Sequence, residues 1–359
     1  MPHYGYLDGI RAILALYVVA HHAWYTVFAF SYGRGVSRYL AVLAHGHYAI
    51  CFFMILSGYC LTLPVLKSGL RLPKGMPVFM KRRAWRILPP YYFALALSMV
   101  LAGVLIHEKT GTLWDMSLPV SPRGIASHVL LVQNLVPGDI LKINYVFWSI
   151  SIEWQVYFFF ALLLLGWRRL GLVPTTLATL LGSLVLEKAV DRYLPITPNA
   201  NFLGLFALGM LACYASFPPE AAAGKLKRLP WRLIAAVSCA LFVALDRRHH
   251  QLTADVAFGC FASALLVIAA RYPDGWVRRV FGFKPLVFVG SFSYSVYLIH
   301  APLLQVLWQY PFAPLQPHAN VMCITLIVVG GPIIVVLAYL FHLCFERPFL
   351  RKKEQRAGA

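Results

Sequence analysis

Ten stretches of the sequence are apolar over roughly twenty residues each, and this pattern restricts the fold more than any other feature. A helix needs about 20 such residues to cross ~30 Å of hydrocarbon. A chain that is 60% hydrophobic and 13% charged also exceeds what one water-soluble core can bury. The sequence therefore predicts an all-α, polytopic membrane helix bundle with about ten transmembrane helices. The stretches cover residues 7–30, 44–66, 86–106, 145–166, 170–189, 201–217, 231–245, 252–270, 286–308 and 321–344, the sixth and seventh being short.

The basic residues indicate how these spans are oriented. Lys and Arg number 32 against 13 acidic residues, and they lie mainly between the apolar stretches. This placement is typical of membrane topology and of contact with anionic headgroups, and it argues against nucleic-acid binding. With ten spans, 23 of the 32 basic residues fall on one side, which predicts that both termini are cytoplasmic. Residues 1–10 lack a basic segment and a small-residue cleavage site, so we expect the first span to be retained.

The domain organisation follows from the absence of any sequence repeat or low-complexity tract. We predict one transmembrane domain over residues 1–351 and a basic cytoplasmic tail over residues 352–359. One outer loop, residues 107–144, is long and contains an apolar stretch that could lie on the membrane surface. We expect this loop to cover a substrate.

Ionisable groups inside membrane spans are costly and are candidates for function, and three of those in the predicted spans stand out. His22 and His300 each lie about 14 residues from the inner start of their spans, and Glu153 lies about eight residues from the outer start of its span. All three then sit roughly 10 Å below the outer face. Each could instead make a hydrogen bond between helices, or neutralise an arginine. Their common depth favours a shared cavity.

A second cluster is basic and lies at the inner face. Arg11 begins the first span, and Arg82, Arg83 and Arg86 precede the third. Topology alone accounts for most clusters of this kind. Arg83 and Arg86, however, are three residues apart, so on a helix they share a face and could grip a phosphate between two guanidinium groups.

The sequence gives no pattern typical of a metal site. The seven cysteines lie in or beside apolar stretches without zinc-ligand spacing. His45 and His47 are close together, but two ligands fall short of the three or four that a zinc site uses. We expect no metal.

Six short motifs occur in a fixed order along the chain. Together they resemble bacterial membrane-bound acyltransferase family 3, whose members O-acetylate polysaccharides, Nod factors and macrolides. The resemblance covers residues 6–351, and six ordered motifs are specific although each alone is weak. The motifs are YLDGIR at 6–11 with His22 following, FFMILSGY at 52–59, RAWRILP at 83–89, WSISIEWQVY at 148–157, SYSVYLIHAPL at 293–303 and ERP at 346–348.

The sequence departs from the family pattern in two respects. Trp154 follows Glu153, where many relatives have another polar or small aromatic residue, and this change could reshape the acceptor pocket. We also find no segment matching the extracellular esterase-like domain of some relatives, so we expect the membrane domain to release the product directly.

The resemblance implies a donor and a path for it. Family members take an acyl group, most often acetyl, from cytoplasmic acyl-coenzyme A. The phosphates would then rest on Arg83, Arg86 and Arg82, and the pantetheine arm would pass Arg11 and Ser57 to present the thioester near His22.

The resemblance also implies catalytic roles for His22, Glu153 and Arg11. His22 would act as general base on an acceptor hydroxyl, with a covalent acyl-histidine as the alternative. Glu153 would orient the imidazole or hold the acceptor hydroxyl.

Four further residues could bind the acceptor, or could serve packing alone: Trp148, Ser149, Ser151 and His300. We expect the acceptor to be a carbohydrate, such as an exopolysaccharide or lipopolysaccharide unit that could be lipid-linked, and the location to be a bacterial inner membrane.

Without the family resemblance, the residues alone would leave two other functions open. A proton-coupled transporter could use Glu153 and the two histidines as a relay, but it would be expected to show matched halves, and the sequence has no internal repeat. A sensor or assembly component without catalysis would keep its function when His22 is replaced.

Overall fold

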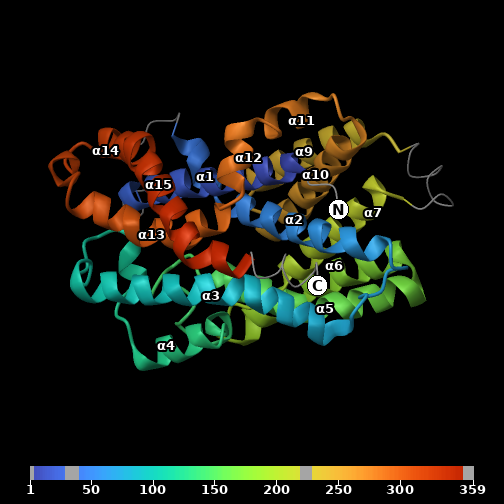
Figure 1. The fold of residues 1–359 in the computed structure, drawn as a ribbon, viewed down its shortest axis with the longest axis horizontal. Helices are drawn as coiled ribbons and strands as arrows, with labels where there is room; N and C mark the ends of the chain where they lie inside the picture. The colour runs from blue at the N-terminus through green and yellow to red at the C-terminus, as the bar shows by residue number, and fades with distance from the viewer. Residues whose placement is uncertain (1–3, 29–39, 219–228, 351–359) are drawn as a thin grey trace. The chain divides into compact units, whose positions relative to one another are not determined.

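The computed structural model describes residues 4–28, 40–218 and 229–350, and within these ranges all regular structure is helical (Figure 1). The all-α class predicted from the sequence is thus confirmed. The α-helices are α1 (Gly5–Phe28), α2 (His47–Leu66), α3 (Gly75–Val104), α4 (Pro122–Val129), α5 (Trp148–Leu170), α6 (Leu172–Tyr193), α7 (Asn201–Ser216), α9 (Trp231–Asp246), α10 (Gln251–Arg271), α11 (Trp276–Phe281), α12 (Lys284–Gly290), α13 (Ser293–Gln309), α14 (Ala319–Thr325) and α15 (Gly331–Phe341).

Six helices in the described ranges are long and apolar enough to cross a membrane. Five are α2, α3, α5, α6 and α10, and the sixth is the continuous segment Ala319–Leu350, which contains α14 and α15. A seventh span arises if α12 and α13, which meet at a bend of 71°, count as one. The polytopic membrane bundle is confirmed. The number ten and the side on which the termini lie stay predictions, and the tail at 352–359 falls outside the described residues.

The chain forms two compact units, between which α1, α2, α3, α5 and α12 are each divided. Unit 1 comprises residues 1–9, 50–80 and 152–284, and unit 2 comprises residues 10–49, 81–151 and 285–359. The prediction of a single domain over residues 1–351 stays a prediction.

Unit 1 is built around close packing of α2, α6, α7, α9 and α10. A Cβ on Gly58 would lie 2.1 Å from the carbonyl oxygen of Phe206, and one on Gly209 would lie 1.9 Å from that of Ile55. Both positions therefore require glycine, because only a residue without a side chain lets two helix backbones approach this closely. This contact fixes the part of α2 that carries Ser57.

Unit 2 contains most of α1 and α3 together with the helices from α12 onward, and Figure 1 shows α13 beside α15 within it. The long loop predicted at 107–144 also belongs to this unit and contains α4 and two short 3-10 turns. Ser121 caps α4 by accepting a hydrogen bond from the Gly124 amide. The Tyr91 and Tyr92 hydroxyls donate to the carbonyls of His128 and Val129. The loop is therefore tied to α3.

His128 is the titratable residue most deeply enclosed by this loop. Its side chain is buried and its Nδ1 donates to the Gly124 carbonyl at 2.7 Å. Burial lowers the pKa of His128, because a charged imidazole would lose its hydration there. The residue is neutral at pH 7 and serves the loop as a hydrogen-bond donor.

Candidate active site

The structure brings His22 and His300 together inside unit 2. His22 lies on α1 and His300 on α13, and the His22 Nδ1 is 2.8 Å from the His300 Nε2. The two rings are nearly parallel, with centroids 5.0 Å apart. The His300 side chain is 0% exposed, whereas His22 stays partly exposed. The pair thus joins an enclosed imidazole to one that a substrate can reach.

The hydrogen bonds of His300 determine which nitrogen carries each proton. Its Nδ1 lies 2.7 Å from the Tyr297 carbonyl oxygen, and a carbonyl can only accept, so this Nδ1 carries a hydrogen. In a neutral imidazole the Nε2 is then an acceptor, and it accepts from the Nδ1–H of His22. The Nε2 of His22 is left with its lone pair, and among the described residues no donor lies within hydrogen-bond distance of it. This atom is a general-base candidate.

A proline and an asparagine shape the turn of α13 that holds His300. Pro302 has no amide hydrogen, so the Leu298 carbonyl cannot make its usual bond within the helix. The Asn144 side-chain amide lies 3.4 Å from that carbonyl and 3.0 Å from the Ser98 hydroxyl. Asn144 therefore ties α13 to the residues that precede α5.

Three aromatic residues around the pair were not singled out from the sequence. The Tyr145 ring meets the His22 ring edge-on at 5.1 Å, and the adjacent His21 donates to the Leu43 carbonyl at 2.6 Å. The Tyr297 hydroxyl donates to the Val146 carbonyl at 2.9 Å. Tyr297 stands three residues before His300, a helical spacing that could have identified it, whereas Tyr145 and His21 have no comparable signal.

The predicted acceptor-binding residues at the start of α5 are held by internal hydrogen bonds. The Ser149 hydroxyl lies 2.6 Å from the Tyr297 hydroxyl, and both hydroxyls reach the Val146 carbonyl, at 3.3 and 2.9 Å. Ser151 donates to the Trp148 carbonyl at 2.7 Å within its own helix. Ser149 and Ser151 are buried, and Trp148 is partly exposed. Their acceptor-binding roles stay predictions, with Trp148 the most accessible of the three.

Glu153 belongs to unit 1, where it forms a separate polar cluster with Ser57 and Tyr157. The Tyr157 hydroxyl donates to the Glu153 Oε1, and the Ser57 hydroxyl donates to the same oxygen at 3.2 Å. Ser57 and Tyr157 are themselves 3.2 Å apart. Ser57 was expected on the donor path, but Tyr157 was missed although it lies four residues after Glu153, on the same helix face. Glu153 is partly exposed, so its Oε2 remains accessible.

The three arginines of α3 expected to hold phosphates differ in how far they are exposed. Arg83 is partly buried and continues the stripe formed by Ile87, Pro90 and Ala94, which are buried. Arg82 and Arg86 are exposed. Arg11 lies in the second turn of α1 and is partly buried. The helical spacing expected for Arg83 and Arg86 is therefore present, with Arg83 the more enclosed residue.

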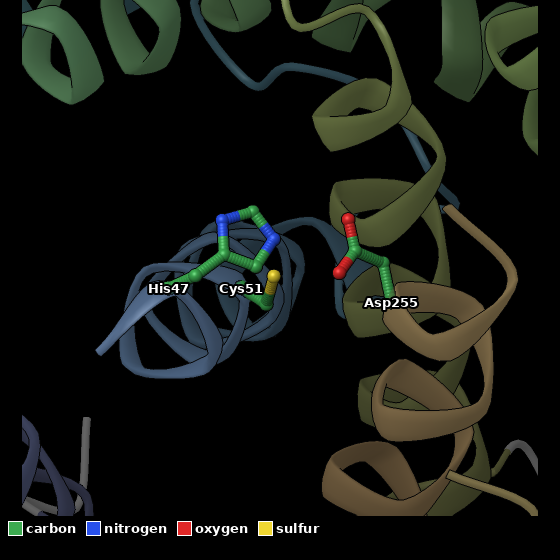
Figure 2. Close-up of side chains that lie close together, drawn as sticks. All are labelled: His47, Cys51 and Asp255. Carbon is green, nitrogen blue, oxygen red and sulfur yellow. The ribbon is translucent and has the colours of Figure 1, made fainter. Parts of the chain in front are cut away.

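Two further buried polar residues, Asp255 and Cys51, lie in unit 1. Figure 2 shows the Asp255 carboxylate facing the Cys51 thiol of α2, with His47 one turn earlier on that helix. One Asp255 oxygen accepts from the Asn201 side chain at 2.9 Å and the other accepts from Gln251 at 2.8 Å. Thiolate and carboxylate groups are ligands that zinc accepts, so these side chains are the ones that could hold a metal. The side-chain amides of Asn201 and Gln251 already give each oxygen of the Asp255 carboxylate a hydrogen-bond donor.

A comparison with protein families assigns this helical chain to a family. A family model described as an acyltransferase domain matches residues 4–343. The chain belongs to this acyltransferase family. The match covers nearly the whole chain, and it confirms the family that the six motifs resemble.

Most of this chain can be aligned with curated relatives, two of which come from different organisms. The peptidoglycan O-acetyltransferase OatA of Listeria monocytogenes is 22% identical over 325 residues, which are 83% of this chain and 49% of that protein. The O-acetyltransferase OatA of Staphylococcus aureus is 23% identical over 328 residues, 83% of this chain and 50% of that protein. The chain thus spans about half the length of these relatives. No solved structure matches the chain.

Proposed function

We propose that this protein is an integral membrane O-acyltransferase that moves an acetyl group from acetyl-coenzyme A to a hydroxyl of a carbohydrate acceptor. The family match and the names of the relatives support acyl transfer to a glycan. The observation that carries the proposal is the His22–His300 pair, since it combines a lone pair on an accessible nitrogen with a second, enclosed imidazole. This arrangement is suited to taking a proton from a hydroxyl.

In the proposed mechanism the His22 Nε2 takes the proton from the acceptor hydroxyl as its oxygen attacks the thioester carbonyl. The new C–O bond forms, the C–S bond breaks, and the imidazolium returns the proton to the departing thiolate. While His22 is charged, His300 stabilises it by accepting the hydrogen bond from its Nδ1. His300 thus takes the place that a carboxylate has in a serine-protease triad.

Glu153 acts on the acceptor in this proposal. Since His300 occupies the Nδ1 side of His22, orienting the imidazole through that nitrogen falls to His300. Glu153 has Ser57 and Tyr157 on one oxygen and an accessible second oxygen, which can accept a hydrogen bond from a sugar hydroxyl. The acceptor we propose is a glycan such as peptidoglycan, an exopolysaccharide or a lipopolysaccharide unit.

The acyl donor, acetyl-coenzyme A, binds at the basic end of α3 in this proposal. Arg83, with Arg86 and Arg82, binds the phosphates of coenzyme A, and Arg11 and Ser57 line the path of the pantetheine arm. Arginine suits this role because its guanidinium can make two parallel hydrogen bonds to a phosphate. Trp148 contacts the sugar of the acceptor.

The test is acetyl transfer by the purified full chain in lipid nanodiscs. Radiolabelled acetyl-coenzyme A is supplied with peptidoglycan fragments, exopolysaccharide or lipopolysaccharide, and label in the glycan is measured for the wild type and for His22→Ala. We expect transfer to fall by about 10⁴ in the variant, at the upper end of general-base effects. The matched control is His107→Ala, since His107 is exposed in the loop, and it should transfer at the wild-type rate.

Other outcomes separate the competing mechanisms and functions. Label that stays on His22 after acid quenching, with no acceptor present, would replace the general-base step by an acyl-histidine intermediate. If no acyl donor is consumed by either protein, while the wild type moves protons together with a solute across vesicles, the transporter would replace the proposed enzyme. An unchanged cellular phenotype in His22→Ala would favour a sensor without catalysis.

A further inference from the structure

A groove of about 590 Å³ lies along the exposed face of α3, within unit 2. Its lining is almost wholly apolar except at one end, where Lys81 lies, and at the other end it reaches Ala96. The fifteen residue steps from Lys81 to Ala96 correspond to ~22 Å of helix. This length covers one leaflet of a hydrocarbon core, which is ~15 Å or half of ~30 Å, together with the headgroup region beyond it.

Contacts with neighbouring elements hold the aromatic residues of the groove in place. Trp85 packs edge-on against Phe349 with ring centroids 5.7 Å apart, and Phe93 packs against Phe345 at 4.4 Å. On the other side the Tyr92 hydroxyl donates to the Val129 carbonyl of α4 at 2.8 Å. The walls of the groove are thus fixed before anything enters it, so an acyl chain would not have to order them.

The Lys81 end of the groove is strongly basic. Lys81, Arg82 and Arg86 are exposed within two turns, and α3 contains no acidic residue. Across the described part of the chain, no carboxylate forms a salt bridge with any of these three side chains. A ligand that fits both ends of the groove therefore has an apolar chain and an anionic head.

We propose that this groove is a binding site for an anionic phospholipid, with one acyl chain between Trp85 and Ala96 and its phosphate at Lys81. The charge of the lipid headgroup determines which lipid binds, since the apolar part of the groove accepts the acyl chain of any phospholipid. A zwitterionic lipid carries its own ammonium group next to the phosphate and gains less from Lys81. No residue of the His22–His300 pair or of the Glu153 cluster lines the groove, and its lysine, Lys81, has no role in the acyl-transfer proposal, although the neighbouring Arg82 and Arg86 also belong to the proposed donor site.

Trp85 provides a native reporter for the test, since bromine atoms on an acyl chain quench tryptophan fluorescence on contact. The full chain is placed in phosphatidylcholine nanodiscs that contain either brominated phosphatidylglycerol or brominated phosphatidylcholine at the same low mole fraction. The difference between the wild type and Trp85→Phe gives the contribution of Trp85 among the nine tryptophans. We expect brominated phosphatidylglycerol to occupy the groove about fivefold more than brominated phosphatidylcholine, the effect of one lysine near an anionic headgroup.

Three variants make the result decisive. Lys81→Gln should abolish the preference for phosphatidylglycerol, whereas Arg169→Gln, which removes an exposed cation from α5, should keep it. Ala96→Phe, at an exposed position in the groove, should reduce Trp85 quenching by both lipids. Equal quenching of Trp85 by the two lipids in the wild type would overturn the proposal, and so would a preference that Lys81→Gln leaves intact.

Discussion

The His22–His300 pair in unit 2 and the Glu153 cluster in unit 1 are both small polar groups in apolar helices, but they differ in what they leave available. In the histidine pair every N–H is directed at an acceptor inside the protein, and an accessible lone pair remains on His22. In the Glu153 cluster two hydroxyls donate to one carboxylate oxygen. The first arrangement stabilises an imidazole that gains a proton, and the second directs two hydroxyl donors at a single carboxylate oxygen.

This difference shows why a histidine within apolar helices can be more informative than an acid there. Two hydroxyl donors would satisfy a glutamate that has only a structural role, so its geometry does not by itself distinguish function from packing. In the histidine pair the hydrogen bonds run in one direction: His22 donates to His300, and His300 donates to the Tyr297 carbonyl. Replacing single links in each group tests whether the two groups have different roles.

The largest effect after loss of His22 itself is expected at His300. His300→Leu removes the acceptor for the His22 Nδ1–H, so the imidazole can adopt the other tautomer, and kcat should fall by about 10². His300→Gln places an amide oxygen near the position of the lost Nε2 and should recover most of the rate. The measurement is kcat and KM for acetyl transfer in nanodiscs.

The glutamine variant separates two roles for His300. If His300 itself exchanges protons with a substrate, glutamine fails as completely as leucine, because an amide does not titrate. If His300 only fills space, both variants should transfer at rates close to the wild type. Either result would mean that the histidine pair and the Glu153 cluster do not differ in the proposed way.

A smaller effect is expected in the Glu153 cluster. Glu153→Gln keeps an oxygen for Ser57 and Tyr157 but removes the negative charge, so binding of the acceptor hydroxyl should weaken and KM for the glycan should rise by about tenfold. Tyr157→Phe leaves the carboxylate and the Ser57 hydrogen bond intact, and its effect should be smaller still. A fall in kcat with unchanged KM for the glycan would show that Glu153 acts on the chemical step instead.

The sequence predicted the class of fold because apolar stretches of spanning length leave few alternatives. It also placed His22 and His300 at one depth, and the structure brings these two side chains into contact. That success depends on counting residues along two helices, which needs no knowledge of how the helices pack.

Other features of the candidate site depend on side-chain direction and could not be read from the chain. Tyr145 lies in the irregular segment before α5, and nothing in the sequence indicates that its ring meets His22. The sequence also does not indicate that His300 donates to the Tyr297 carbonyl, although this hydrogen bond determines the tautomer of His300. The bend of 71° between α12 and α13 was also missed, because an apolar stretch of spanning length looks the same whether it is straight or broken.

The smallest predicted effect concerns the donor site, and it sharpens the comparison by changing a different kinetic constant. Arg83→Lys keeps the positive charge on the more enclosed face of α3 but loses the planar fork, so KM for acetyl-coenzyme A should rise by about fivefold while kcat changes little. Arg169→Lys, at an exposed position on α5 away from the proposed donor site, should change neither constant appreciably. If Arg83→Lys leaves KM for acetyl-coenzyme A unchanged, Arg83 contributes only to membrane topology. Because the histidine variants should alter kcat and the Glu153 variant should alter KM for the glycan, the three sets of variants assign chemistry, acceptor and donor to separate groups of residues.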